Sequence, residues 1–65
     1  MKRKDLEHAL KECLWSFLRH GGNHDVWTNG TLTQPVPRHN EVNERLAKHI
    51  LKIAQSNPGG KETQS

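Results

Sequence analysis

Apolar residues near the start of the chain recur with the period of an α-helix. They follow the spacing that forms one stripe on a helix face: Leu6, Ala9, Leu10, Cys13 and Leu14. Asp5 and Glu7 fall in the first turn, where carboxylates favour the helix dipole, and Lys11 falls near the end. The pattern predicts a helix over residues 3–13, with Cys13 as a small core residue rather than a nucleophile or ligand.

The middle of the chain has the composition of three short strands. Aromatic, β-branched and other apolar residues gather in runs too short for helices, with turn residues between them. The expected strands cover residues 15–19, 24–28 and 31–34.

Glycine, asparagine and proline mark the turns around these strands. Gly21-Gly22 separates the first two strands, and Asn29-Gly30 favours a two-residue type I′ hairpin into the third, because both residues accept positive φ. Pro35 and Pro37 cannot donate ladder hydrogen bonds. The third strand must therefore end there or lie on an edge of the sheet.

A second helical stripe occupies the C-terminal part of the chain. Its apolar members are Val42, Leu46, Ala47, Ile50, Leu51, Ile53 and Ala54. Asn40 is a good N-cap residue, and Glu41 and Glu44 occupy the first turns. We therefore expect a helix over residues 41–55.

The order helix, three strands, helix predicts an α+β fold, α-β-β-β-α, with a three-stranded antiparallel sheet and both helices on one face. The opposite face would stay open for a partner. The run Ser-Asn-Pro-Gly-Gly at 56–60 ends the second helix. Residues 58–65 are polar and without periodicity, so we expect a domain over 1–57 and a disordered tail over 58–65.

Composition narrows the function classes. The 65 residues carry a formal charge of +3, with ten Lys and Arg against seven acidic residues, which mildly favours polyanionic partners. With one cysteine no internal disulfide can form, and no apolar run is long enough for a signal peptide or a membrane span. We expect a soluble, cytoplasmic protein of one domain at most, whose site must be shallow.

The stretch from Arg19 to Trp27 carries the candidate chemistry. Gly21-Gly22 lets the backbone turn or approach a ligand closely, and His24 follows at the start of a predicted strand. Arg19 has donors that suit a phosphate, and Asn23 can donate to a phosphate or sugar oxygen. Gly-Gly between strands is also an ordinary turn, and Arg or His beside it is often only solvated surface. These nine residues alone leave both interpretations open.

Two separated motifs resemble the HicA family of bacterial toxins. The first is Arg19-x-x-Gly22-Asn23-His24-x-x-Trp27, followed by Asn29-Gly30. The second is the run Pro-Val-Pro-Arg-His-Asn-Glu-Val at 35–42, which leads into Leu46-Ala47-x-x-Ile50-Leu51-Lys52. The likeness covers about residues 2–55. One departure is Leu14, which stands where the family usually has a glycine suited to a left-handed helix cap.

The resemblance implies a fold like that of double-stranded-RNA-binding domains, an mRNA interferase activity and a HicB-type antitoxin that blocks the toxin. In the family the histidine of the Gly-x-His motif is catalytic, and the matching position here is His24.

Independently of the resemblance, the chemistry of RNA cleavage supports a metal-independent mechanism. RNA supplies its own nucleophile, the 2′-hydroxyl, so one imidazole acting as general base or acid suffices, without a cofactor. Arg19 and Arg38 are candidates for RNA phosphate contact, with Asn23 and the Gly22 amide as weaker ones. Trp27 could stack on a base, although core packing suits it better in so small a domain.

His20 and His39 are possible second proton-transfer groups, but neither is expected to be catalytic. His20 stands four residues before His24 across a turn, where this spacing has no defined geometry, and a structural role is at least as plausible for His39. No metal site is expected, since a structural zinc ion needs four close ligands and only His20 and His24 have nearly suitable spacing.

The alternative function is a non-catalytic RNA- or protein-binding module. A DNA-binding subunit is disfavoured because no predicted helix has a dense basic face.

Overall fold

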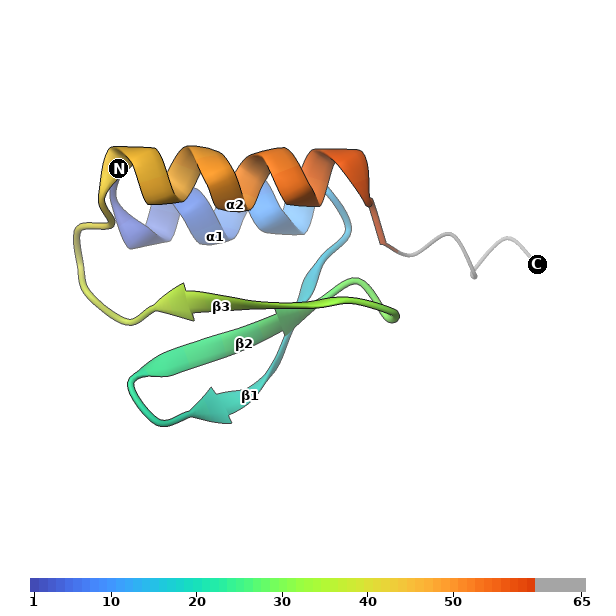
Figure 1. The fold of residues 1–65 in the computed structure, drawn as a ribbon, viewed down its shortest axis with the longest axis horizontal. Helices are drawn as coiled ribbons and strands as arrows, with labels where there is room; N and C mark the ends of the chain where they lie inside the picture. Colours follow the sequence, from blue (N-terminus) through green and yellow to red (C-terminus); the bar gives the residue numbers. More distant parts are fainter. Residues whose placement is uncertain (60–65) are drawn as a thin grey trace.

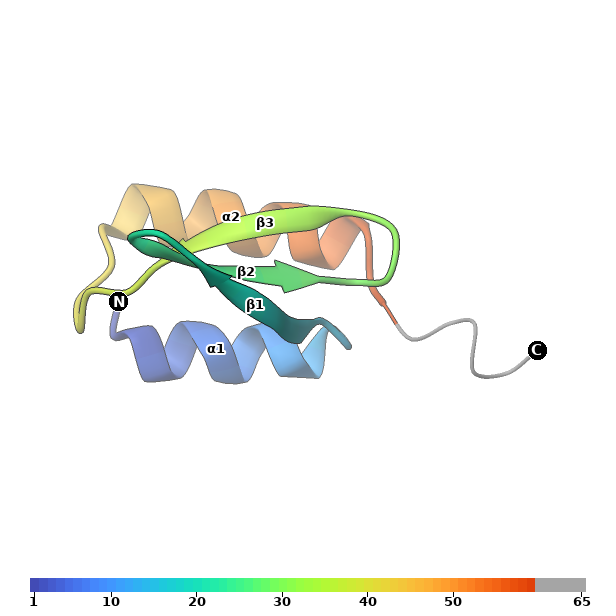
Figure 2. The ribbon, with the colours of Figure 1, turned by 90° about the horizontal axis from the view of Figure 1, so that it is seen from below.

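The computed structural model describes residues 1–59, which form two layers (Figure 1). The elements in chain order are α1 (Arg3–Glu12), β1 (Ser16–Gly21), β2 (His24–Thr28), β3 (Thr33–Pro37) and α2 (Glu44–Ser56). The strands form one antiparallel sheet in the order β1-β2-β3. The two helices lie side by side over one face of this sheet and run in the same direction (Figures 1 and 2). The predicted α+β fold is confirmed.

The core lies between the helix layer and the sheet. Because β2 is central, its inward residue Trp27 is covered from above and is only 3% exposed. The other buried apolar residues come from both helices, β3 and the connecting segments: Leu6, Leu10, Trp15, Val36, Val42, Ala47, Ile50 and Ala54. Burial of these side chains is the main source of stability in a domain of this size.

Helix α1 ends in a Schellman motif, in which the residue after the cap has a left-handed conformation. The Leu14 N–H donates to the Lys11 carbonyl at 2.9 Å, and the Trp15 N–H donates to the Leu10 carbonyl at 3.0 Å. Leu14 itself has φ 68° and is 59% exposed. The helix thus ends as it would with a glycine, although a leucine there costs about 1–2 kcal/mol of strain.

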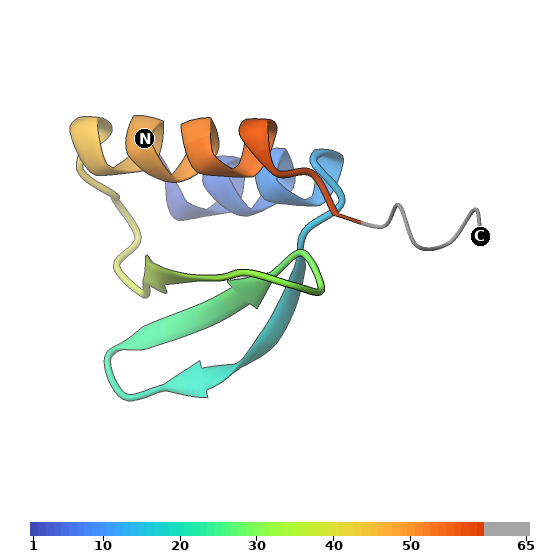
Figure 3. The same ribbon diagram turned by 45° about the vertical axis from the view of Figure 1, so that its right-hand side comes forward.

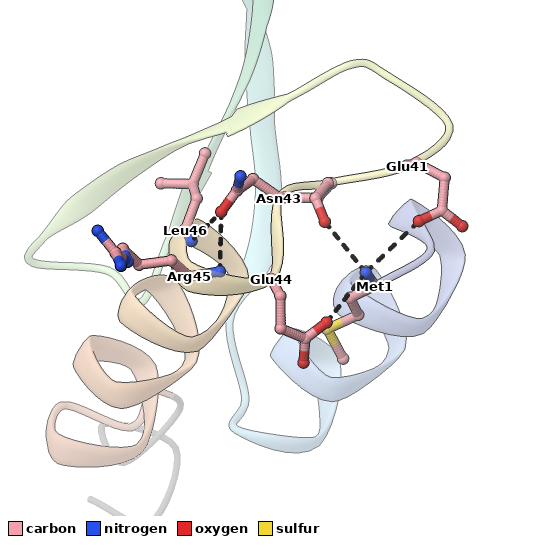
Figure 4. Close-up of polar contacts among 7 residues, drawn as sticks. Met1, Glu41, Asn43, Glu44, Arg45 and Leu46 are labelled. Atoms are coloured by element: carbon pink, nitrogen blue, oxygen red, sulfur yellow. Dashed lines mark hydrogen bonds and ion pairs between the residues drawn. The ribbon is translucent and has the colours of Figure 1, made fainter.

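Helix α2 begins three residues later than the sequence predicted. The N-cap is Asn43, not Asn40: its side-chain oxygen accepts hydrogen bonds from the N–H groups of Arg45 and Leu46, at 2.8 and 3.3 Å (Figure 4). Asn40 instead pairs with the start of α1, since its carbonyl accepts from the Arg3 N–H at 2.9 Å. This pairing, together with the bridge between Lys2 and Glu41, holds the segment out of the helix until Asn43.

The β2–β3 connection differs from the predicted two-residue hairpin. Asn29 does not have positive φ, which a type I′ turn requires, and only Gly30 does, at 102°. The Asn29 side chain accepts from the N–H groups of Thr31 and Leu32, at 2.8 and 2.6 Å, and so builds a longer loop. Strand β3 therefore starts at Thr33 and continues through both prolines, which an edge strand tolerates.

Contacts with the rest of the domain are made both at residue 57, the predicted boundary, and at Gly59 just past it. The Trp15 indole donates to the Asn57 carbonyl at 2.9 Å, and the Gly59 N–H donates to the Cys13 carbonyl at 2.9 Å. Gly59 is buried, and an added Cβ would collide with the Leu14 carbonyl. Residues 60–65 of the expected tail lie outside the described residues.

Candidate functional site

The β1–β2 hairpin carries most of the candidate residues, and its turn points away from the helix layer (Figures 1 and 3). Gly22 and Asn23 form the turn between Gly21 and His24, which pair across the two strands. Gly22 has φ 60°, and a Cβ added there would meet nothing within 4 Å. The turn is therefore bare, meaning that no side chain covers the Gly22 backbone, and a ligand can approach this backbone closely.

His24 lies on the sheet face that the helices leave open. Side chains alternate along a strand, and because Asp25 and Trp27 are buried under the helices, His24 and Val26 point the other way. The His24 side chain is exposed, and within residues 1–59 it makes no hydrogen bond or ion pair. Its ring is accessible from solvent and unpaired among the described residues.

Arg19 lies beside His24 on this open face. Arg19 pairs with Val26, so the two side chains share a face. A Cβ added to Gly21 would come within 3.4 Å of Arg19 Nη1 and 3.3 Å of Val26 Cγ2. The guanidinium thus lies at contact distance from the position of a Cβ at Gly21, whose partner across the strands is His24, and it places a fixed positive charge on the face of the imidazole.

A second group of polar side chains lies on the other face of the same hairpin. The Asp25 carboxylate, with 13% of its side chain exposed, accepts a hydrogen bond from His20 Nδ1 at 2.8 Å. The same carboxylate oxygen lies 3.6 Å from Arg38 Nε, and Arg38 Nη1 donates to the Gly22 carbonyl at 3.3 Å. Arg38 therefore ties the segment after β3 to the β1–β2 turn.

The hairpin turn also borders a shallow hollow of about 550 Å³. It is lined by Asn23, Arg38 and His39, all of which are exposed. Its position follows from the register, because His24 pairs with Pro37 and so brings the residues after β3 next to the turn. The hollow gives Arg38 and Asn23 room to contact a ligand.

The structure distributes the predicted site residues over four places. Arg19 and His24 share the open face, Asn23 and Arg38 border the hollow, and Gly22 lies between the two groups. Trp27 is buried and packs edge-on against Phe17, with 6.3 Å between ring centroids, so its ring is not available to stack on a base. For Trp27, core packing is the observed role.

Asp25 is the residue that sequence reasoning missed. Alternation along residues 24–28 already placed it on the same face as the buried Trp27, and an acidic residue facing a core needs a charged partner. That signal could have singled it out. The identity of its partners, His20 and Arg38, depended on the pairing of three strands.

Metal-binding clusters and membrane-spanning helices are both absent from the part of the chain that the structure describes. Within residues 1–59 no three His, Cys, Asp or Glu side chains are grouped so that they could hold a metal ion. None of the helices in this range has the length and apolar character needed to cross a membrane.

Fold and site together define a small α+β protein with an exposed histidine and arginine at a bare hairpin turn. The family model for the HicA toxin of bacterial toxin–antitoxin systems matches residues 3–55 of the 65. The chain belongs to this family and is the toxin component of a toxin–antitoxin system, with an antitoxin as its partner. No curated protein and no solved structure matches the chain.

Proposed function

We propose that this toxin is a metal-independent endoribonuclease that cleaves mRNA in the cytoplasm through His24, and so stops translation and growth. The observation that carries the proposal is the exposed His24 ring beside the Arg19 guanidinium at the bare Gly22 turn. An imidazole exchanges protons near neutral pH, and a neighbouring guanidinium stabilises negative charge on a phosphate.

The chemistry requires little from the protein because RNA contains its nucleophile. The ribose 2′-oxygen attacks the adjacent phosphorus while its proton passes to a base, and the bond from phosphorus to the 5′-oxygen breaks as that oxygen gains a proton. His24 is suited to one of these two proton transfers, which contributes about a hundred- to ten-thousand-fold. The products are a 2′,3′-cyclic phosphate and a 5′-hydroxyl.

Side chains around the turn bind the RNA backbone in this proposal. Arg19 contacts the phosphate that reacts, and Arg38 contacts a neighbouring phosphate, with Asn23 and the exposed Gly22 amide as additional donors. The open hollow beside Asn23 and Arg38 accommodates such a contact without rearrangement of the domain.

The antitoxin is proposed to be of the HicB type. Strand β1 is an edge of the sheet and exposes Phe17 and Leu18, which are 45% and 49% exposed. An exposed edge with apolar side chains is a suitable place for a protein to bind, and it lies next to the proposed catalytic residues. A HicB-type gene beside the gene of this chain would support the assignment.

Cleavage by the purified protein tests the nuclease. A 5′-labelled single-stranded RNA should be cut by the unmodified chain, and His24→Ala should reduce the rate by about a hundredfold or more without changing thermal stability. EDTA should have no effect. His49, exposed on α2, supplies the matched control, since His49→Ala should cleave normally.

Two results would contradict the proposal that the protein is a nuclease. One is an unmodified chain that binds RNA or the antitoxin but cuts nothing, which would favour a non-catalytic binding module. The other is a His24→Ala variant that cuts as fast as the unmodified chain. Expression in bacteria should agree, with growth arrest by the unmodified chain and none by the variant.

A further inference from the structure

Asp25 is a buried carboxylate that takes no part in the proposed reaction. It is the only acidic or basic residue among the buried residues of the range 1–59, with a relative exposure of 9%. Burying a carboxylate is costly unless polar or charged partners compensate for the lost water, and a small domain has little stability to spare. One of its two partners is Arg38, which is also a proposed contact of the RNA backbone. A buried anion is thus placed against a residue proposed to bind the substrate.

Arg38 is held at three points before any ligand arrives. Its Nε lies 3.6 Å from the Asp25 carboxylate, and its Nη1 donates to the Gly22 carbonyl at 3.3 Å. Its own carbonyl accepts from Arg3 Nη1 at 2.6 Å, which ties the backbone of this segment to α1. An unrestrained surface arginine loses rotamer freedom when it binds a ligand, and this loss opposes binding. The contacts of Arg38 reduce the loss because the side chain is already ordered.

The orientation of the guanidinium leaves part of it available to an anion. A guanidinium has five N–H donors in a rigid planar fork, so fixing two of its nitrogen atoms fixes the third. Nη2 makes no hydrogen bond or ion pair within residues 1–59, and the Arg38 side chain is 48% exposed. Arg38 also lines the open hollow beside Asn23 and His39. A phosphate in this hollow therefore meets a guanidinium whose direction is set by Asp25 and the Gly22 carbonyl.

Arg38 and the proposed reaction centre lie on different faces of the hairpin. The Asp25 side chain is on the helix-facing side of β2, and Arg38 reaches the turn from that side. Arg19 and His24 are on the open face, and the bare turn at Gly22 lies between. Any phosphate that Arg38 contacts is therefore a different one from the phosphate that reacts. A contact of this kind strengthens substrate binding without changing the chemical step.

We propose that Asp25 is a positioning residue for substrate binding: it orients the Arg38 guanidinium so that it contacts a phosphate in the hollow, on an RNA strand that crosses the bare turn. His20 supports this arrangement, because it donates to the same carboxylate oxygen at 2.8 Å and so restrains the Asp25 side chain. The inference rests on the proposed RNA substrate, and it does not depend on which group transfers the protons.

Asp25→Asn tests the role through the sign of its effect on binding. The substitution removes one negative charge, so overall electrostatics alone would tighten the binding of RNA. The positioning role gives the opposite result, a binding constant weaker by about tenfold, which is the effect of losing one charged hydrogen bond. The probe is a 2′-O-methyl RNA oligonucleotide, which has the phosphates of RNA but no nucleophile. Tighter or unchanged binding by a folded Asp25→Asn chain would overturn the proposal.

Glu12→Gln is the matched control for charge. It also removes one carboxylate that contacts a histidine, here His8 at 3.1 Å, but this carboxylate is 71% exposed and lies at the end of α1 away from the turn (Figure 2). Its binding of the oligonucleotide should be as tight as that of the unmodified chain or slightly tighter. An equal loss of binding in Glu12→Gln and Asp25→Asn would overturn a specific role for Asp25.

A double substitution tests whether Asp25 acts through Arg38. Arg38→Gln should weaken binding about tenfold and lower the slope of log Kd against log salt concentration by about 0.7, the value for one phosphate contact on a single strand. In the Arg38→Gln chain, a further Asp25→Asn should cause no additional weakening. The same weakening with and without Arg38 would mean that Asp25 acts on another group, and the proposal would be overturned.

Arg38→Lys keeps the proposal testable if Asp25→Asn does not fold, which thermal unfolding shows. Lysine retains the charge, but its single ammonium group lacks the planar fork that contacts Asp25 and the Gly22 carbonyl together. Arg38→Lys should therefore bind the oligonucleotide about as weakly as Arg38→Gln. Binding as tight as that of the unmodified chain would show that charge alone matters, and would overturn the positioning role.

Single-turnover cleavage of ordinary RNA separates this inference from the nuclease itself. Asp25→Asn should raise the concentration that gives half the maximal rate by about tenfold and leave the rate at saturation within a fewfold. A large fall in the saturated rate alone would place Asp25 in the chemical step and overturn its role in binding. If the unmodified chain binds the oligonucleotide and cuts no RNA, the nuclease is overturned and the binding tests still decide the role of Asp25. If it does not bind the oligonucleotide, both proposals are overturned.

Discussion

Arg19 and His24 lie next to each other on the open face of the sheet, on either side of the hairpin turn. Gly21 pairs with His24, and a Cβ added to Gly21 would lie 3.4 Å from Arg19 Nη1, which is an ordinary contact distance. The Arg19 guanidinium therefore extends along the face on which His24 lies. A fixed positive charge shares this face with a histidine whose side chain makes no hydrogen bond or ion pair among the described residues.

Arg19→Gln should therefore lower RNA cleavage more than RNA binding. Losing one preorganised donor to a reacting phosphate typically costs about a hundred- to a thousandfold in kcat. The measurement is kcat and KM on a short single-stranded RNA. Arg45→Gln, an exposed arginine on α2, is the control and should leave both constants unchanged. An equal effect of the two substitutions would contradict a specific role for Arg19.

The cap of α2 gives a test that involves no RNA. Asn43→Ala removes the acceptor for two N–H groups of the first turn and should lower the free energy of unfolding by about 1 kcal/mol. Asn40→Ala should change it by less than about 0.5 kcal/mol, as for an ordinary surface substitution. Urea denaturation of the two variants distinguishes the observed helix start from the one that the sequence predicted.

Leu14 offers a stabilising substitution. At φ 68° a leucine is strained, and its side chain is largely exposed, so little packing is lost on its removal. Leu14→Gly should raise the free energy of unfolding by about 1 kcal/mol, after the greater flexibility of glycine in the unfolded chain is subtracted. Leu14→Ala keeps the Cβ and should give no such gain. Thermal denaturation of both variants would show the difference.

The amino group of Met1 makes stability depend on pH. It lies 3.3 Å from a Glu44 carboxylate oxygen, 3.5 Å from one of Glu41 and 3.0 Å from the Val42 carbonyl (Figure 4). The hydrogen bond to Glu44 is the largest effect, and together with the charges of both glutamates it outweighs desolvation and raises the pKa of the amine above 8.0.

Because this pKa is higher in the folded chain than in the unfolded one, the stabilisation is complete below about pH 8 and is lost as pH rises through the folded value. The unmodified chain should be more stable than an Nα-acetylated chain at pH 7, and the two should converge at high pH. Unfolding experiments on both chains across this range measure the effect. A difference that persists at high pH would mean that the acetyl group acts through something other than charge.

The sequence by itself determined the order of elements and part of the core. The stripes with helical spacing placed Leu6, Leu10 and Ile50 in the interior, because the period of a helix is a local property. They also included Leu14 and Leu46, which the structure exposes. The prolines at 35 and 37, which lack a donor, allowed the third strand either to end there or to lie on an edge, and the structure shows the edge. The Gly-x-His motif also singled out His24 as the candidate for proton transfer.

The tertiary structure decided which side chains meet. Whether helix α2 starts after Asn40 or Asn43 depended on the pairing of Asn40 with Arg3, from the other end of the chain. The contact of Asp25 with His20 and Arg38 depended on an irregularity in β1 and on the register of all three strands. Such contacts join residues that are distant in sequence, and no local pattern specifies them, because register is set when the whole sheet packs against the helices.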